Sequence, residues 1–191
     1  MAVGGEVGCP PTPLFMPRPP REEVEGGVFH VFARGNNRDL IYLDEEDYAR
    51  YSAVLGAVAR QHDWRLLAFC LMPNHVHLLV ETPKPNLGDG MQRLHGVYAR
   101  EFNRRHTRCG HLFQGRYGAV RVTTDEQLWM VARYIATNPV AAGLCSGPAQ
   151  WAWSSHAAVV AKSASLDRRA ETDGVLRRGG RRRARSLRWV R

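Results

Sequence analysis

The chain has 191 residues and a formal net charge of +9, and 44% of its residues are hydrophobic. That length allows one domain with a proper core, or one domain and a tail. No apolar stretch is long enough to cross a membrane, and no secretory signal is visible. The four cysteines form no close pair. These features exclude a membrane protein and a disulfide scaffold, and they predict a soluble protein of a reducing compartment.

The positive charge is concentrated at one end of the chain. Residues 161–191 hold 11 Lys and Arg against 3 Asp and Glu, whereas residues 1–160 hold 16 against 15. Such a basic tail predicts disorder and unspecific binding to nucleic acid phosphates. An accidental end produced by a shifted reading frame explains it equally well. Residues 1–15, rich in Gly and Pro, predict a flexible arm, so the expected folded domain is 16–160.

The first predicted elements are a strand, a helix and a hairpin. Alternating apolar residues predict a strand at 28–34, and Asp44 is a suitable N-cap for a helix that follows it. Two further apolar strands are predicted at 65–71 and 75–82. The segment Met72-Pro73-Asn74 between them predicts a hairpin turn.

The second strand of this hairpin carries two histidines, His75 and His77. Side chains alternate along a strand, so both imidazoles share one face and the aliphatic residues between and after them fill the other. Two histidines on one face of a rigid strand provide half of a metal site. A structural or surface pair of histidines would show the same spacing.

A basic segment follows the hairpin. Residues 87–106 predict an amphipathic helix, and between Arg93 and Arg121 there are seven arginines and one acidic residue, Glu101. An ordinary solvated face is one interpretation. Because aromatic residues such as Phe113 lie among the arginines, we favour a phosphate track with stacking groups, which single-stranded DNA requires.

A short strand at 118–123 and a helix at 124–138 complete the predicted elements. Thr124, with Gln127 three residues later, forms a capping box, and Pro139 is expected to end the helix. The order βαββαβ plus a terminal helix predicts an α+β fold, a ferredoxin-like sandwich with its first and third strands central. The two histidines are then expected in the middle of the sheet.

The last helix carries a tyrosine and an amide on one face. Tyr134 and Asn138 are four residues apart, so they lie one above the other. A phenol and a carboxamide on one rigid element can supply a nucleophile and an oxygen ligand. A core tyrosine and an asparagine that ends the helix are the plainer interpretation.

Taken together, these motifs resemble the HUH single-strand nucleases with one catalytic tyrosine. Within them the chain is similar to the REP-associated tyrosine transposases, relatives of the IS200-like transposases, over roughly residues 16–160. The segments that carry the resemblance are MPRP at 16–19, FHVFARGNNR at 29–38, LMPNHVH at 71–77, FNRRH at 102–106, GHLFQGRY at 110–117, YI and NP within 134–139, and WSS at 153–155.

The resemblance implies cleavage and rejoining of single-stranded DNA near hairpins through a covalent phosphotyrosine. It makes Tyr134 the nucleophile and His75, His77 and Asn138 the ligands of a divalent ion, Mg²⁺ or Mn²⁺. A tyrosine hydroxyl is a weak nucleophile because its unperturbed pKa is about 10, so an ion that polarises the phosphate helps. Tyr117, in the basic loop, is the alternative nucleophile.

The expected partner is single-stranded or hairpin DNA, with no membrane contact, and the expected state is a monomer or homodimer. The expected location is cytoplasmic and nucleoid-associated. The side chains expected to contact DNA are cationic, amide or aromatic. They are Arg18, Arg34, Asn36, Arg93, Arg100, Arg104, Arg105, Arg116 and Tyr117.

Two positions depart from the family pattern. Ala141 stands where family members usually carry arginine, and Glu101 stands where an aromatic residue is common. These departures put DNA affinity in doubt more than chemistry. Two other functions stay open: a hairpin-binding protein derived from a transposase without strand transfer, and a phosphohydrolase whose metal ion activates water.

Overall fold

The computed structural model describes residues 24–160, and the structural statements below refer to that part of the chain. The expected arm at 1–15, Arg18 and the basic tail at 161–191 lie outside the described residues. Within 24–160, no helix combines the length and apolar character that crossing a membrane requires.

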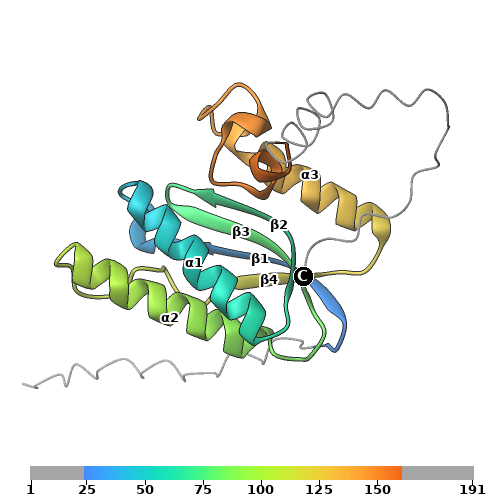
Figure 1. Ribbon diagram of the computed structural model, residues 1–191, viewed down its shortest axis with the longest axis horizontal. Coiled ribbons are helices and arrows are strands. Elements are labelled where there is room, and N and C mark those ends of the chain that lie inside the picture. Colours follow the sequence, from blue (N-terminus) through green and yellow to red (C-terminus); the bar gives the residue numbers. More distant parts are fainter. Residues whose placement is uncertain (1–23, 161–191) are drawn as a thin grey trace, which may run out of the picture.

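Four strands form one antiparallel sheet at the centre of the fold (Figure 1). They are β1 (Gly27–Arg34), β2 (Arg65–Met72), β3 (His75–Thr82) and β4 (Gly118–Val122). Their order across the sheet is β2-β3-β1-β4, so the first and third strands are central as predicted. The expected α+β ferredoxin-like arrangement, with a further helix after βαββαβ, is confirmed.

Helices lie on both faces of this sheet (Figure 1). The helices α1 (Glu45–Gln61) and α2 (Leu87–Arg105) cover one face. The third, α3 (Asp125–Ala141), packs mainly on β2 and β3 from the other face. Short 3-10 turns lie at 36–38 and 148–150, and residues 155–160 are helical.

Both predicted N-caps are present. The Asp44 carboxylate accepts a hydrogen bond from the backbone N–H of Asp47 at the start of α1. The Thr124 hydroxyl does the same for the N–H of Gln127 at the start of α3. Each cap satisfies an N–H that has no partner within its own helix, which is why these helices begin where the sequence predicts.

The predicted end of α3 is wrong. The helix continues past Pro139 to Ala141, and it closes at Gly143, whose φ of +70° suits glycine. The Leu144 N–H then donates to the Pro139 carbonyl. Proline costs the helix one N–H, but Pro139 is buried and its packing holds the last turn in place. Asn138 therefore lies inside the helix rather than at its end.

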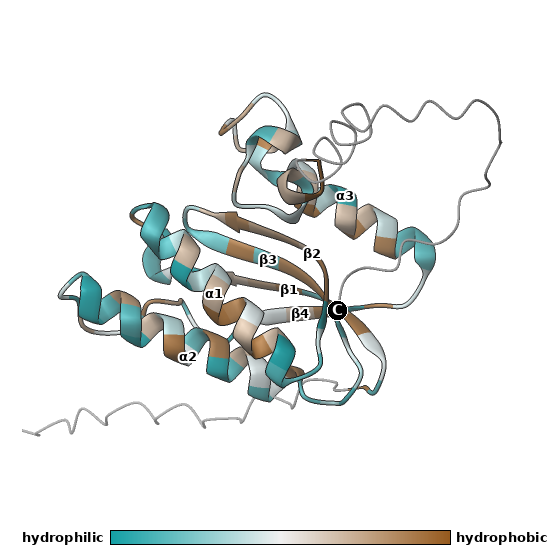
Figure 2. Ribbon diagram, in the orientation of Figure 1, coloured by the Kyte–Doolittle hydropathy of each residue, from teal (hydrophilic) through white to brown (hydrophobic). Residues whose placement is uncertain are grey.

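The two faces of the sheet bury different cores. The larger core, between the sheet and α1 and α2, includes Tyr51, Leu94 and Phe102. The smaller core lies under α3 and consists of Ala68, Cys70, Met72, Leu79 and Ile135. Figure 2 shows β2 largely brown, whereas α1 and α2 are banded with teal where polar residues face outward.

The face under α3 is only partly covered. Phe32 on β1 and Val120 on β4 are 40% and 57% exposed. Strand alternation places Phe32 on the face opposite to its buried neighbours Val31 and Ala33, which belong to the larger core. This face of the sheet therefore has a closed half at β2 and β3 and an open half at β1 and β4.

Candidate active site

The two histidines of β3 face α3. His75 and His77 flank Val76, which points into the larger core on the other side of the sheet. The two ring centroids are 5.1 Å apart, and His77 is 8% exposed. The rings therefore lie side by side at the border between the closed and open halves of this face.

Helix α3 brings a tyrosine and an amide to the same place. The Tyr134 ring stands edge-on to His77, with 5.3 Å between centroids. Asn138, one helical turn further on, lies close enough to His75 for its side chain to raise the pKa of that imidazole. Ile135 is 1% exposed and anchors this part of α3 on the sheet. The four residues singled out in the sequence thus meet at one site, although their roles stay a prediction.

Exposure separates Tyr134 from the other tyrosines. All six tyrosines lie in the described part of the chain, and Tyr134 is 49% exposed. Tyr117 is 6% exposed, it packs in the larger core, and its hydroxyl is buried. The loop turns the Tyr117 ring inward, so its hydroxyl is less accessible than that of Tyr134. The expected roles of Tyr117 as a DNA contact or alternative nucleophile stay predictions. The remaining buried tyrosines are Tyr42, Tyr48, Tyr51 and Tyr98.

Two residues that the sequence prediction missed hold the imidazoles. His30 on β1 lies with its Nε2 3.1 Å from His77 Nδ1. His75 Nδ1 donates to Asn74 Oδ1 over 2.7 Å, and Asn74 Nδ2 donates to the Arg38 carbonyl. The bond to Asn74 leaves His75 Nε2 with a lone pair. Histidines that bind metal commonly have their second nitrogen held in this way.

Burial keeps the three imidazoles neutral. It lowers the pKa of His77 to about 3, and the pKa is lowered further because a protonated His77 would be repelled by protonated His75 or His30 and by Arg34. Burial is also the main cause that lowers the pKa of His75 and of His30. At neutral pH each ring is therefore unprotonated and can offer a lone pair to a cation. Arg34 is exposed and pairs with His75 across β1 and β3.

The donor set fits a divalent ion. His75 and His77 with the Asn138 amide would give such an ion three neutral ligands, which would leave it its full charge and open positions for substrate. Within residues 24–160, no group of three or more His, Cys, Asp or Glu side chains could hold a metal. His30 stays outside the ligand set because its Nε2 faces His77 Nδ1.

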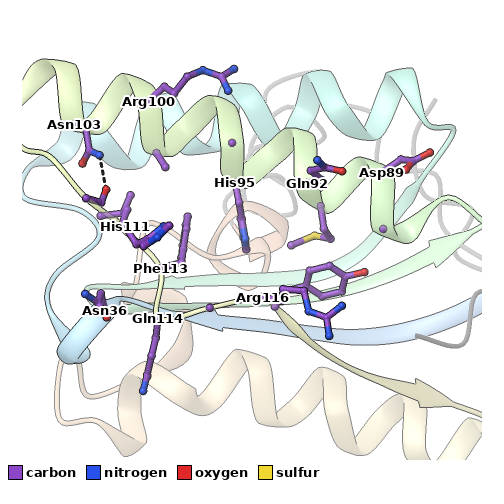
Figure 3. A pocket seen from close by; sticks show the side chains of 18 residues that line it. Asn36, Asp89, Gln92, His95, Arg100, Asn103, His111, Phe113, Gln114 and Arg116 are labelled. Atoms are coloured by element: carbon purple, nitrogen blue, oxygen red, sulfur yellow. Dashed lines mark hydrogen bonds between the residues drawn. The ribbon is translucent and has the colours of Figure 1, made fainter. Parts of the chain in front are cut away.

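A large hollow lies on the α2 side of the sheet, between α2 and the loop that precedes β4 (Figure 3). Its volume is about 1040 Å³. A smaller hollow of about 410 Å³ continues along α2 beside Arg93 and shares Arg100 with the first. Of the residues expected to contact DNA, those that line the large hollow are Asn36, Arg100, Arg116 and Tyr117.

The loop at this hollow reaches the end of the sheet that carries the histidines. The Gln114 N–H donates to the Arg34 carbonyl, and the Asn36 N–H donates to the Leu112 carbonyl. Because Arg34 is the partner of His75 in the sheet, the hollow and the histidine pair adjoin the same end of β1.

The arginines on this side divide into two kinds. Arg105 binds the carboxylates of Asp44, Glu46 and Asp47, and Asp47 is 1% exposed. Its guanidinium thus ties the end of α2 to the start of α1, and its expected contact with DNA stays a prediction. The exposed arginines of the expected set on this side are Arg93, Arg100, Arg104 and Arg116.

Comparison with known proteins supports the fold and identifies the family. The family model described as "Transposase IS200 like" matches residues 23–138. The fold is similar to that of a REP-associated tyrosine transposase whose structure contains a bound REP hairpin. The TM-score is 0.66 with 19% identity, over 78% of this chain and 87% of that one.

A second solved structure, a putative transposase from Deinococcus radiodurans R1, has 23% identity and a TM-score of 0.44. The match covers 62% of this chain and 95% of that one. No curated protein matches this chain. Since the family model covers more than half of the sequence, the chain belongs to the IS200-like transposase family, and its role lies in DNA processing.

Proposed function

We propose that this protein cleaves and rejoins single-stranded DNA through a covalent bond to Tyr134. One observation carries the proposal. Tyr134 is the exposed tyrosine among six that are otherwise buried, and its ring lies against His77 on a helix that also supplies Asn138. Nucleophile, neutral imidazoles and an amide are the parts that phosphoryl transfer with a metal ion needs.

Each step forms one P–O bond and breaks another, so the reaction needs no separate energy source. The Tyr134 oxygen bonds to phosphorus while the bond from phosphorus to the leaving 3′ oxygen breaks, and the phenol proton ends on that oxygen. A 3′-hydroxyl later attacks the phosphotyrosine, which releases Tyr134 and restores a phosphodiester. His75, His77 and Asn138 would hold a divalent ion, Mg²⁺ or Mn²⁺, which supplies electrophilic stabilisation of the phosphate oxygens.

The chain itself contributes positioning. Tyr134 and Asn138 are one turn apart on α3, so the distance between nucleophile and ligand is set by the helix. The hydrogen bond between His30 and His77, and the one that His75 donates to Asn74, fix the planes of the two imidazoles. Arg34, exposed beside His75, is suited to bind a phosphate oxygen.

Hairpin DNA is the proposed partner. The structural relative with a TM-score of 0.66 was determined with a REP hairpin bound. In this chain the exposed arginines along α2 and the adjoining loop would bind the phosphates of the hairpin. Such contacts position a nucleic acid without reading its sequence. The strand would then continue past Arg34 to Tyr134.

Covalent capture tests the proposal. The protein is incubated with a labelled single strand bearing a hairpin and with Mg²⁺ or Mn²⁺, and is then run on a denaturing gel. We expect a labelled protein band that Tyr134→Phe abolishes. Tyr117→Phe is the matched control and should keep the band. Mass spectrometry of the band then locates the DNA remnant, which we expect on Tyr134.

The alternatives predict different results. Cleavage of the strand with no labelled protein would indicate a phosphohydrolase in which the ion activates water. Hairpin binding with neither cleavage nor adduct would indicate a binding protein derived from a transposase. A remnant on another residue would refute the assignment of Tyr134.

A further inference from the structure

The open half of the sheet beside Tyr134 carries an exposed aromatic side chain. Phe32 is 40% exposed, on the same face of the sheet as the histidines. Its ring centroid lies 5.6 Å from His30 and 6.3 Å from His77. Tyr134 contacts the same two histidines, with 6.0 Å to the His30 ring centroid and 5.3 Å to that of His77. Both aromatic side chains thus border the pair formed by His30 and His77, next to the candidate ion site.

The Phe32 ring is held in a defined position. Gly118 is its direct partner on β4, and a Cβ added at Gly118 would overlap the Cδ2, Cε2 and Cζ atoms of the ring. One edge of the ring therefore lies over the glycine, and His30 packs beside it. A ring held in this way loses little conformational freedom when a flat partner binds to its exposed part.

Covering a strand glycine is a sufficient structural reason for an aromatic residue here. It does not explain why so much of the ring stays in contact with water. A protein partner or a second copy placed on this surface would block Tyr134, which the substrate must reach. The substrate strand itself has to cross this face, because its phosphate must lie beside Tyr134 and His77.

We infer that Phe32 stacks with the base of a nucleotide next to the scissile phosphate. The inference rests on the proposed function, and it adds the path of the substrate strand across β1 and β4. Every base has a π face, so such stacking binds single-stranded DNA with little sequence preference. A paired base is already stacked within its duplex, so the site selects unpaired DNA at the position of cleavage.

The test uses the full chain with Tyr134→Phe, so that DNA binds without being cleaved. A hairpin oligonucleotide carries 2-aminopurine at one position of its single-stranded flank, and the position is moved along the flank. Fluorescence and affinity are measured without divalent ions, which separates stacking from ion binding. We expect quenching at one position, or at two neighbouring ones.

Three variants decide the outcome. Phe32→Leu still covers Gly118, and it should lose the quenching and weaken binding about 10-fold, within the range known for base stacking on aromatic side chains. Phe32→Tyr should keep both signals. Trp129→Leu removes another exposed aromatic, 69% exposed and about 140° around α3 from Tyr134, and should change neither. Equal thermal midpoints confirm that all three variants fold.

Quenching and affinity that survive in Phe32→Leu would overturn the inference, as would a signal that depends on Trp129 instead. Adduct formation by the protein with Tyr134 intact is measured in parallel. If no adduct forms, the proposed function fails, whatever Phe32 does. If the adduct forms while Phe32→Leu binds DNA like its parent, only the stacking site fails.

Discussion

The two faces of the sheet have different roles in this protein. On the face under α1 and α2, residues such as Tyr51, Leu94 and Tyr98 are fully buried, and the Tyr98 hydroxyl donates to the Ile41 carbonyl. On the face under α3, the core is small and gives way to His75, His77 and an open surface. Stability is therefore concentrated on one face and the candidate chemistry on the other. Strand alternation makes this possible, since neighbouring residues of β3 serve opposite faces.

The largest expected effect is on ion affinity, and it should distinguish two histidines that both have lowered pKa values. His77 lies on the face under α3, and His95 lies on the face under α1 and α2. We expect His77→Ala to reduce ion affinity and adduct yield by more than about 100-fold, because a ligand is lost. His95→Ala should leave ion affinity unchanged and lower stability, because His95 stacks on Phe113 with 4.0 Å between centroids. Calorimetric titration with Mn²⁺ and urea denaturation separate the two effects. Equal ion affinities in both variants would contradict the proposed site.

The next prediction compares the two cores. Leu94→Ala should lower the free energy of unfolding by about 2–5 kcal/mol, because it leaves a cavity in the larger core. Ile135→Ala should cost about 2 kcal/mol or more and should also lower the adduct yield per folded molecule, because Ile135 holds α3 on the sheet next to Tyr134. Denaturation midpoints and gel-based adduct yields measure both. An unchanged yield in Ile135→Ala would show that α3 is positioned by other contacts.

The hydrogen bond between His30 and His77 gives a third prediction. His30→Leu should weaken Mn²⁺ binding by about 10–100-fold, because His77 loses the partner that orients it. His30→Gln retains a polar group and should recover part of the affinity. Phe29→Leu, the neighbouring residue that faces the larger core, should affect stability and not ion binding. If His30→Leu binds Mn²⁺ like the parent, His30 has only a packing role.

Much of the fold could be predicted because its signals are local. The strand His75–Thr82 has the predicted bounds, and Asp44 and Thr124 cap their helices as expected. Local signals failed at Pro139, where the helix continues because the proline side chain is buried. Packing outweighed one lost hydrogen bond there, and a propensity rule does not include that contribution.

The site could be predicted only where spacing along one element decides it. His75 and His77 share a strand face, and Tyr134 and Asn138 share a helix face, so both pairs were evident. His30 was missed because its contact with His77 depends on the pairing of β1 with β3, where His30 stands opposite Leu79. The available signal was that His30 lies on the first predicted strand, which was expected to be central next to the strand of His75 and His77.

Contacts that the sequence does not reveal engage two of the residues expected to contact DNA. Arg105 lies in a basic stretch, but its acidic partners Asp44 and Asp47 are 61 and 58 positions away in sequence. Tyr117 follows an exposed arginine, yet the loop folds its ring into the larger core. In each case, contacts between distant segments determine whether the side chain is available.

Buried neutral histidines on both faces of the sheet should make the protein less stable as the pH falls. Burial lowers the pKa of His77 to about 3 and that of His95 to about 4. The unfolded chain therefore binds protons below about pH 6.5 that the folded chain excludes, so stability should fall as the pH drops, by at most about 1.4 kcal/mol per pH unit for each histidine. Urea denaturation from about pH 7 to about pH 5 measures the slope. His77→Gln and His95→Gln should each flatten it, because each removes one histidine that the unfolded chain protonates and the folded chain does not.

The smallest expected effect distinguishes two adjacent arginines at the end of α2. Arg104 is exposed, so Arg104→Gln should weaken hairpin DNA binding a few-fold and reduce the slope of log affinity against log salt by about 0.7–0.9, the share of one phosphate contact. Arg105→Gln should leave that slope unchanged and lower stability, because it leaves the buried Asp47 carboxylate without its closest cation. DNA affinity is measured at several salt concentrations for both variants, with urea denaturation alongside. A reduced salt slope in Arg105→Gln would show that DNA displaces the carboxylates from this guanidinium, and that the network between α1 and α2 opens when DNA binds.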